Sequence, residues 1–298
     1  MGCGLGPGEA DEGEAALRIT RDHGAELIAE ATVSDPTESE TVIRVLDREA
    51  EIGTRFGGGF VQSIEGIEGG AAGGRRSDWF FFVNGVESGA GAAEVRVRAG
   101  DRIWWDYRDW TDAMRAPAVV GSWPEPFAQR SAGADRTPVL VECAAAGPRC
   151  DEVAERLAGE GVDVGTEHFP VEGKHVADEA LRVLVGPWAE LRRDSAAAQL
   201  EDGPATSGVF ADFALLGGGW ELRALDQRTQ EAERLSGGAG LVAAVRELDE
   251  PPTWLVTGTD ADGVEAAVEL LDAEGLLDRY AVAVDAAGPI PLPVEGAG

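Results

Sequence analysis

Aromatic side chains crowd two short segments of the chain, 78–86 and 100–107, and their order could build a surface that binds a flat ligand. Side chains along a strand alternate between its two faces. Trp104 therefore lies opposite Trp105, and Trp110 is in phase with Trp104. Exposed rings stack on flat or amphipathic molecules. The predicted ligand-binding residues are Trp79, Asn84, Trp104 and Trp110. The alternative is that this second face packs against the following domain or linker, and both hold if the ligand sits in the cleft between domains.

Cys143 and Cys150 could form a disulfide. Six residues with a Gly147-Pro148 turn separate them, so the two Cβ atoms can approach, and an oxidising compartment would then join them. The alternative is two unpaired thiols, one of them at a helix N-terminus that would lower its pKa.

Cys3 suggests lipidation. It follows Gly2 and precedes a glycine-rich acidic segment, which resembles the mature end of a bacterial lipoprotein, where the cysteine carries the lipid. The apolar signal segment expected before it is absent from the sequence. Either a signal peptide was trimmed, the start is misplaced, or Cys3 is an ordinary cysteine.

No catalytic residues and no metal ligands are predicted. Ser195 and Ser207 have no histidine in a recognisable arrangement, and the sequence holds no Walker A, G-x-G-x-x-G or G-x-S-x-G motif. The histidines, His23, His168 and His175, are scattered rather than spaced as ligands. We expect a protein that is not an enzyme.

The segment Thr257-Gly-Thr-Asp260 allows two interpretations. It lies where a strand should pass into a helix, so its backbone N–H groups could bind an anion. Alternatively, Thr259 or Asp260 caps the helix.

The charge excludes one class of partner. The chain has 298 residues, 55 acidic and 25 basic, with a formal net charge of −30. Such a field repels nucleic acid and anionic membrane surfaces. The charge serves solubility and reflects a GC-rich genome, or else it attracts cations. The length suits two domains, and no segment is apolar enough for a transmembrane helix.

The first third predicts a small domain of strands and one helix. Residues 16–20 read as a strand and 37–49 as a helix, with Thr37 and Glu40 at capping-box spacing. A glycine-preceded strand, 57–67, precedes the two aromatic segments. Asn84-Gly85 is a tight-turn dipeptide.

These segments carry a family resemblance. The W-x-x-x-V-N-G motif from Trp79 and the G-D-x-I-x-W-x-Y motif from Gly100 resemble DUF4430, which is similar to the C-terminal domain of transcobalamin and intrinsic factor. The resemblance covers residues 15–112 and implies a β-grasp-like fold. It places Ile103, Trp105 and Tyr107 in the core, so that Trp104 is left without a core role.

The rest of the chain alternates strand and helix patterns, which indicates a mixed or parallel sheet covered by helices. The expected strands are 138–143, 181–186, 207–211, 220–225, 253–258 and 280–284, and the expected helices 151–158, 188–200, 241–248 and 262–272.

The predicted fold class is α+β and α/β: an N-terminal β-grasp-like domain followed by a helix-covered mixed α/β domain. The predicted division is a flexible tether at 1–14, the DUF4430-like domain at 15–112, a linker or extension at 113–136, the α/β domain at 137–290 and a tail at 291–298. Trp123 and Phe127 are the expected anchors of the linker onto the first domain.

The resemblance implies an exported, envelope-associated binding protein that takes up cobalamin or a similar flat ligand. Transcobalamin-like proteins also use a helical barrel, which has no counterpart here. The alternative is a non-catalytic envelope module that contacts protein or polysaccharide. Expected partners are a small molecule or an envelope or transport protein, with no nucleic acid, and a membrane only through a lipid anchor. The expected location is the cell surface or periplasm.

Overall fold

The computed structural model places two compact units, residues 1–110 and 111–298. The residues that it describes are 8–55, 59–128, 137–144, 147–169, 180–247 and 250–295. Each unit combines helices with strands, so the predicted mixture of α and β structure is confirmed. None of the helices in these ranges is both long and apolar enough to cross a bilayer. Cys3 and His175 lie outside the described residues.

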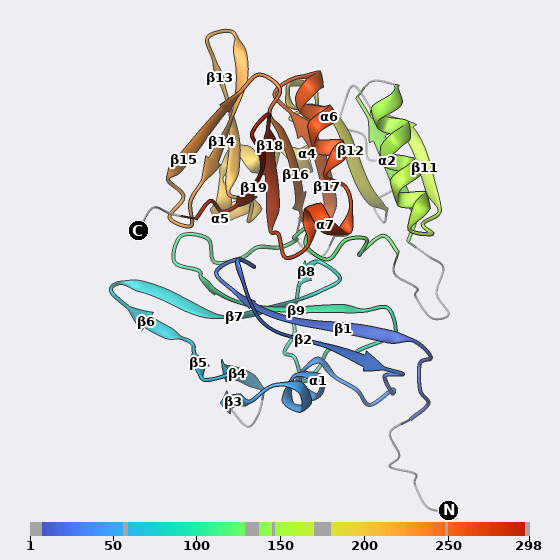
Figure 1. Ribbon diagram of the computed structural model, residues 1–298, viewed down its shortest axis with the longest axis vertical. Coiled ribbons are helices and arrows are strands. Elements are labelled where there is room, and N and C mark those ends of the chain that lie inside the picture. The colour runs from blue at the N-terminus through green and yellow to red at the C-terminus, as the bar shows by residue number, and fades with distance from the viewer. Residues whose placement is uncertain are drawn as a thin grey trace, which may run out of the picture. The chain divides into compact units, whose positions relative to one another are not determined.

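The first unit is built on a mixed sheet (Figure 1). Its strand order is β2 (Glu26–Ser34), β1 (Glu14–Arg21), β9 (Arg102–Asp109), β7 (Arg75–Val83) and β6 (Gly70–Ala72), and β8 (Val86–Glu87) also pairs with β7. The central strands β1 and β9 are parallel, and the other pairs are antiparallel. A small antiparallel sheet comprises β3 (Ile52–Arg55), β4 (Phe60–Ile64) and β5 (Ile67–Glu68).

One face of the large sheet forms the core of the first unit. The alternating residues of β1, β7 and β9 that lie on it are buried against helix α1 (Val42–Glu49) and β4. Trp105 stacks on Phe81, with ring centroids 4.8 Å apart. The predicted core role of Ile103 and Trp105 therefore holds, and Tyr107 packs on Trp79 at the edge of the same cluster.

The start of this unit differs from expectation. Helix α1 begins at Val42, and its N-cap Thr41 makes no side-chain capping bond, so the capping box at Thr37 and Glu40 is wrong. Thr37 instead bridges to Ala10. Residues 9–11, predicted as tether, thus pair with 36–38 through backbone hydrogen bonds, because extended backbone there finds donors and acceptors in a neighbouring segment.

The second unit is built on a seven-stranded sheet. Its order is β11 (Val164–His168), β10 (Val139–Cys143), β12 (Leu181–Pro187), β17 (Thr253–Gly258), β16 (Gly240–Val245), β18 (Ala281–Asp285) and β19 (Gly288–Leu292). The neighbouring pairs among the first four strands are parallel, and the remaining three neighbouring pairs are antiparallel.

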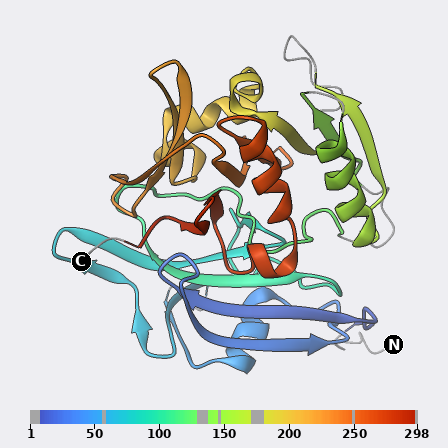
Figure 2. The ribbon, with the colours of Figure 1, turned by 45° about the horizontal axis from the view of Figure 1, so that its top comes forward.

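Each face of this sheet is covered. Helices α2 (Pro148–Gly159) and α6 (Ala261–Glu269) lie on one face (Figure 2). The other face packs against a group of short helices: α3 (Trp188–Leu191), α4 (Ser195–Ala198), η2 (Gln199–Asp202) and α5 (Pro204–Ser207). It also packs against a hairpin of β13 (Ala211–Leu216) and β14 (Gly219–Leu225). Strand β14 pairs in turn with β15 (Glu231–Ser236). The remaining helix is α7 (Ala273–Leu276).

Five predictions for this unit need correction. The predicted helix 241–248 is not formed over its described part, 241–247, because the apolar run 240–245 is buried on both sides as β16. The predicted helix 188–200 is broken at Asp194, and the strand at 207–211 starts only at Ala211. Trp123 and Phe127, expected to anchor the linker or extension on the first domain, instead pack with Trp254 in the core of the second unit. The predicted tail contributes Pro291 and Leu292 to β19.

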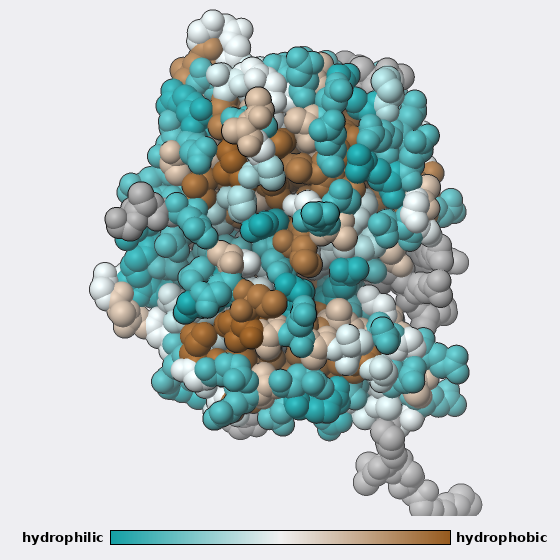
Figure 3. Space-filling model, viewed as in Figure 1, coloured by the Kyte–Doolittle hydropathy of each residue, from teal (hydrophilic) through white to brown (hydrophobic). Residues whose placement is uncertain are grey.

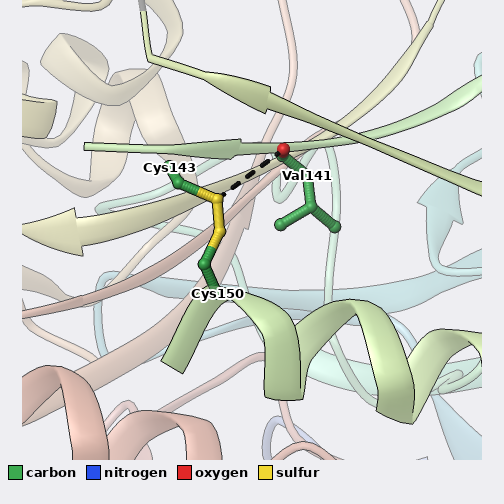
Figure 4. Close-up of a disulfide and its surroundings, with 3 residues drawn as sticks. All are labelled: Val141, Cys143 and Cys150. Carbon is green, nitrogen blue, oxygen red and sulfur yellow. Dashed lines mark hydrogen bonds between the residues drawn. A yellow bond between two sulfur atoms is a disulfide. The ribbon is translucent and has the colours of Figure 1, made fainter. Parts of the chain in front are cut away.

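A disulfide joins the end of β10 to the first turn of α2 (Figure 4). The Cα atoms of Cys143 and Cys150 are 6.0 Å apart, within the range that a disulfide spans. Both cysteines are buried. The bond therefore fixes the start of α2 against the sheet.

A buried ion cluster ties α4 to the same sheet. The guanidinium of Arg182 in β12 donates to Glu142 in β10 (Nε to Oε1, 2.7 Å) and to Asp194 (Nη2 to Oδ2, 2.6 Å). Burial opposes the charged form, but the hydrogen bonds to both carboxylates raise the pKa of Arg182 above its usual value. Asp194 also caps α4 through the N–H of Ala196.

Asp260 decides between the two interpretations of the segment 257–260. Its carboxylate accepts from Gly263 N (3.0 Å) at the start of α6 and from Gly238 N (2.8 Å). A Cβ on Gly263 would lie 2.1 Å from the carbonyl oxygen of Ala239. The helix start is thus capped by its own carboxylate and packed against backbone, which favours the capping role.

We predict that Asp260→Ala lowers the free energy of unfolding by about 1–2 kcal/mol, because the cap and the Gly238 contact are lost together. Urea denaturation measures this. Asp262→Ala is the control, since Asp262 is an exposed residue of the same first turn. Equal losses in the two variants would contradict the capping role.

We also predict that replacing both Cys143 and Cys150 by alanine costs about 2–3 kcal/mol of stability, the loop-closure value for so short a loop. Urea unfolding of oxidised protein and of the variant gives the difference. Intact mass after alkylation under non-reducing conditions should show no modified thiol at either position. Two alkylated cysteines would contradict the pairing.

Candidate functional site

The second face of the large sheet in the first unit carries aromatic and charged residues in alternation. Cross-strand partners on it are Phe82 with Trp104, Phe80 with Asp106, and Asp78 with Arg108. The rings of Phe82 and Trp104 are 5.4 Å apart. We call this set, together with Thr20 and Trp110, the second face.

Thr20 connects β1 to β9 on this face. Its hydroxyl oxygen accepts from the indole N–H of Trp104 at 2.7 Å, and the hydroxyl donates to Asp106 Oδ1 at 2.7 Å. Thr20 and Asp106 are fully buried and Trp104 is 3% exposed. Trp104 is therefore held by a buried hydrogen bond within its own unit.

Asp106 also organises the β1–β2 turn. Its carboxylate accepts from the backbone N–H groups of His23 and Gly24, both at 3.1 Å. His23 has a positive φ of 59°. Burial, and then the charge of Arg108, lower the pKa of His23 to about 3. At neutral pH the imidazole is uncharged.

Arg108 is a buried cation with two partners on the face. Its guanidinium carbon lies 3.9 Å from the centre of the Phe80 ring, and Nη2 donates to Glu87 at 3.0 Å. A ring face and a carboxylate together stabilise a guanidinium. The sequence analysis missed four residues of this site: Thr20, Phe80, Glu87 and Arg108. The alternation of side chains along β1 could have placed Thr20 on this face, but the pairing of β1 with β9 has no local sequence signal.

The four predicted ligand residues have different environments. Trp79 lies on the core face and donates to the carbonyl of Ile67 at 2.9 Å. Asn84 is buried in the turn, and its side-chain amide donates a hydrogen bond to the Asp101 carboxylate at 2.8 Å. Burial raises the pKa of Asp101, against the effect of that hydrogen bond.

Trp110 is the member of the four whose ring is partly exposed. The guanidinium carbon of Arg76 lies 5.1 Å from the ring centre, and the backbone N–H of Trp110 donates to the Arg76 carbonyl at 2.9 Å. Phe80 is also partly exposed. The second face therefore has two partly exposed aromatic residues, each with a guanidinium over its ring.

At the carboxyl ends of the parallel strands, a usual ligand position in α/β sheets, β10 and β12 of the second unit are closely packed. Strands β10 and β12 are neighbours whose connections leave in opposite directions. A Cβ on Gly186 would lie 2.4 Å from that of Ala144. The hydroxyl of Ser207 donates to the Gly203 carbonyl and accepts from the Val209 N–H. Within the described ranges, no three His, Cys, Asp or Glu residues are grouped to hold a metal.

We predict that His23 makes stability fall below neutral pH. Its folded pKa is below the unfolded value, so the unfolded state binds the extra proton between about pH 6.5 and 3, and stability is lost as pH falls through that window. From pH 7 to pH 5 the wild type should lose about 2 kcal/mol more than His23→Asn. Asparagine tolerates the positive φ. Parallel pH dependences in urea unfolding would contradict the assignment.

The comparisons with known proteins match parts of the chain. A crystal structure from Ruminococcus gnavus ATCC 29149, described as that of "a putative metal binding protein", is similar at 14% identity over 33% of this chain and 98% of that one, with a TM-score of 0.26, which is too low to carry an argument. No curated protein matches. Residues 39–109 match the model of DUF4430, a domain of unknown function, which confirms the family resemblance predicted for this part of the chain.

Proposed function

We propose that this chain is a non-catalytic binding protein whose first unit takes a flat ligand, cobalamin or a similar molecule, on the exposed end of the second face. The observation that carries the proposal is the partly exposed Trp110, whose ring lies beneath the Arg76 guanidinium. Phe80 on the same face is also partly exposed and lies beneath the Arg108 guanidinium. Rings and guanidinium planes are the groups that stack on flat π systems.

The fold supports this proposal. We infer a β-grasp-like first unit from the helix α1 on one face of a sheet whose central strands β1 and β9 are parallel. Such a sheet buries one aromatic set in the core, and on its other face Phe80 and Trp110 remain partly exposed. Trp79 and Asn84 then support the neighbouring strand and turn, and Trp104 anchors the face through Thr20.

The cellular setting belongs to the same proposal. We propose an exported protein at the cell surface or in the periplasm, held by a lipid on Cys3, that hands its ligand to an envelope or transport protein. The disulfide at Cys143 supports an oxidising compartment.

A protein-contact module is the second candidate, and one observation favours it. Leu215 and Leu216 at the tip of the β13–β14 hairpin are 61% and 42% exposed, and Figure 3 shows apolar side chains there. Exposed leucines at a hairpin tip are typical of contact surfaces.

Equilibrium dialysis with cyanocobalamin, and separately with protoporphyrin, tests the first candidate. We predict that Trp110→Ala weakens binding by about tenfold, the loss of one stacked ring at 1–3 kcal/mol. Trp220→Ala is the matched control, because Trp220 is also partly exposed with a guanidinium over its ring (Arg192, 5.4 Å) but lies in the second unit.

Equal affinities of both variants and the wild type would contradict the site. No binding of either compound, with loss of envelope retention in Leu215→Ser/Leu216→Ser, would favour the protein-contact module instead.

A further inference from the structure

Strand β2 lies at one end of the strand order in the large sheet of the first unit (Figure 1). It is nine residues long, whereas β6 at the other end has three. An edge strand carries N–H and C=O groups that point away from the sheet, and these groups can pair with another extended chain. Strand β2 is thus long enough to receive a further strand.

The hydrogen-bond pattern identifies the outward groups of β2. Ala16 in β1 donates its N–H to the Asp101 carbonyl at 2.8 Å, so the even-numbered residues of β1 bond to β9 and the odd-numbered ones to β2. The β2 partners of these odd-numbered residues are Ala29, Ala31 and Val33.

The alternate residues of β2 therefore direct their backbone groups outward. These residues, which we call the β2 edge, are Glu30, Thr32 and Ser34. Among the residues that the structure describes, no partner for their outward N–H and C=O groups is found. All three side chains are exposed. The β2 edge is thus an unpaired row of donors and acceptors.

The side chains of the β2 edge leave these groups accessible. Thr32 and Ser34 are small, and the Glu30 carboxylate reaches inward to Arg18 of β1, with Oε2 and Nη1 2.6 Å apart. In the second unit, the edge strand β19 instead carries Pro289 and Pro291, which have no N–H to offer. The β2 edge lacks this protection against pairing.

The charge around the β2 edge indicates the chemistry of its partner. The side chains of Glu26 and Glu30 are 57% and 64% exposed, whereas those of their partners Arg21 and Arg18 are 42% and 22% exposed. The carboxylate is therefore the more accessible group of each ion pair. The chain as a whole carries −30, so a basic segment is attracted to this edge.

The same charge disfavours a second copy of this chain as the partner. Two copies would bring −30 against −30. Antiparallel pairing of two β2 edges would also place glutamates of the two strands near each other, and like charges on neighbouring strands are destabilising. The partner is thus a different protein.

We propose that the β2 edge binds an extended segment of a partner protein, rich in lysine or arginine, as an additional strand. Main-chain hydrogen bonds to Glu30, Thr32 and Ser34 hold the segment, and basic side chains near Glu30 give the preference for it. This binding goes beyond the proposed function and is independent of the flat ligand.

Fluorescence anisotropy with two labelled heptapeptides, KTVKVTK and ETVEVTE, tests the charge preference. The two peptides share their alternating pattern and differ in the sign of their charge. We expect the lysine peptide to bind at least about tenfold more tightly, because the field of the chain attracts one and repels the other.

Replacing Thr32 tests the backbone pairing. Thr32→Pro removes an outward N–H, which an edge strand tolerates, and Thr32→Ala is the matched control that keeps it. We expect Thr32→Pro to weaken binding of the lysine peptide about tenfold, because a peptide carbonyl loses its donor. Thr32→Ala should stay within about twofold of the wild type. Urea unfolding checks that both variants are folded.

N-methylated lysine peptides give a second readout that needs no protein variant. A strand added at an edge pairs through one of its own two sides. Methylating the alternate N–H groups of one side should therefore abolish binding, and methylating those of the other side should leave it unchanged.

Three outcomes would overturn the proposal: undetectable binding of the lysine peptide, equal binding of the two methylated peptides, or equal affinities of Thr32→Pro and Thr32→Ala. Sedimentation velocity covers the remaining occupant. A wild-type dimer that Thr32→Pro dissociates would assign the β2 edge to a second copy of the chain and would also overturn the proposal.

Discussion

The hydroxyl of Thr20 is the link on which the first unit depends. It lies between the indole N–H of Trp104 and the carboxylate of Asp106, and so joins the parallel central strands β1 and β9 through side chains as well as backbone. Buried polar groups are costly unless they are paired. This bridge allows a buried carboxylate, a buried indole and the neutral His23 to share one face of a sheet whose other face is an apolar core.

The tryptophans of the first unit therefore have two roles: some stabilise the fold, and one is placed to contact the proposed ligand. Trp79 and Trp105 complete the core, and Trp104 is held by Thr20, so that the ring left partly exposed is that of Trp110. The second unit is constrained differently. Its helix starts are fixed by covalent and ionic links, the disulfide at α2 and the Arg182 cluster at α4. At the carboxyl ends of β10 and β12, Gly186 packs closely against Ala144.

Local patterns predicted most of the strands, because alternation and the Asn84-Gly85 turn act over a few residues. The run at 240–245 was assigned to a helix because a strand buried on both faces shows no alternation. The disulfide could be anticipated from loop length. The Thr20 bridge and the Arg108–Glu87 pair could not, since each joins residues more than 20 positions apart whose proximity depends on strand order.

A double-mutant cycle with Thr20→Val and Trp104→Phe tests the central claim most directly. Thr20→Val conserves shape, and Trp104→Phe keeps an aromatic ring but lacks the indole N–H that donates to Thr20. Urea unfolding at pH 7 should give a coupling free energy of about 1 kcal/mol, the value of one buried hydrogen bond. A coupling below about 0.3 kcal/mol, within the additivity of independent sites, would show that the two residues act separately and that the second face is not organised around Thr20.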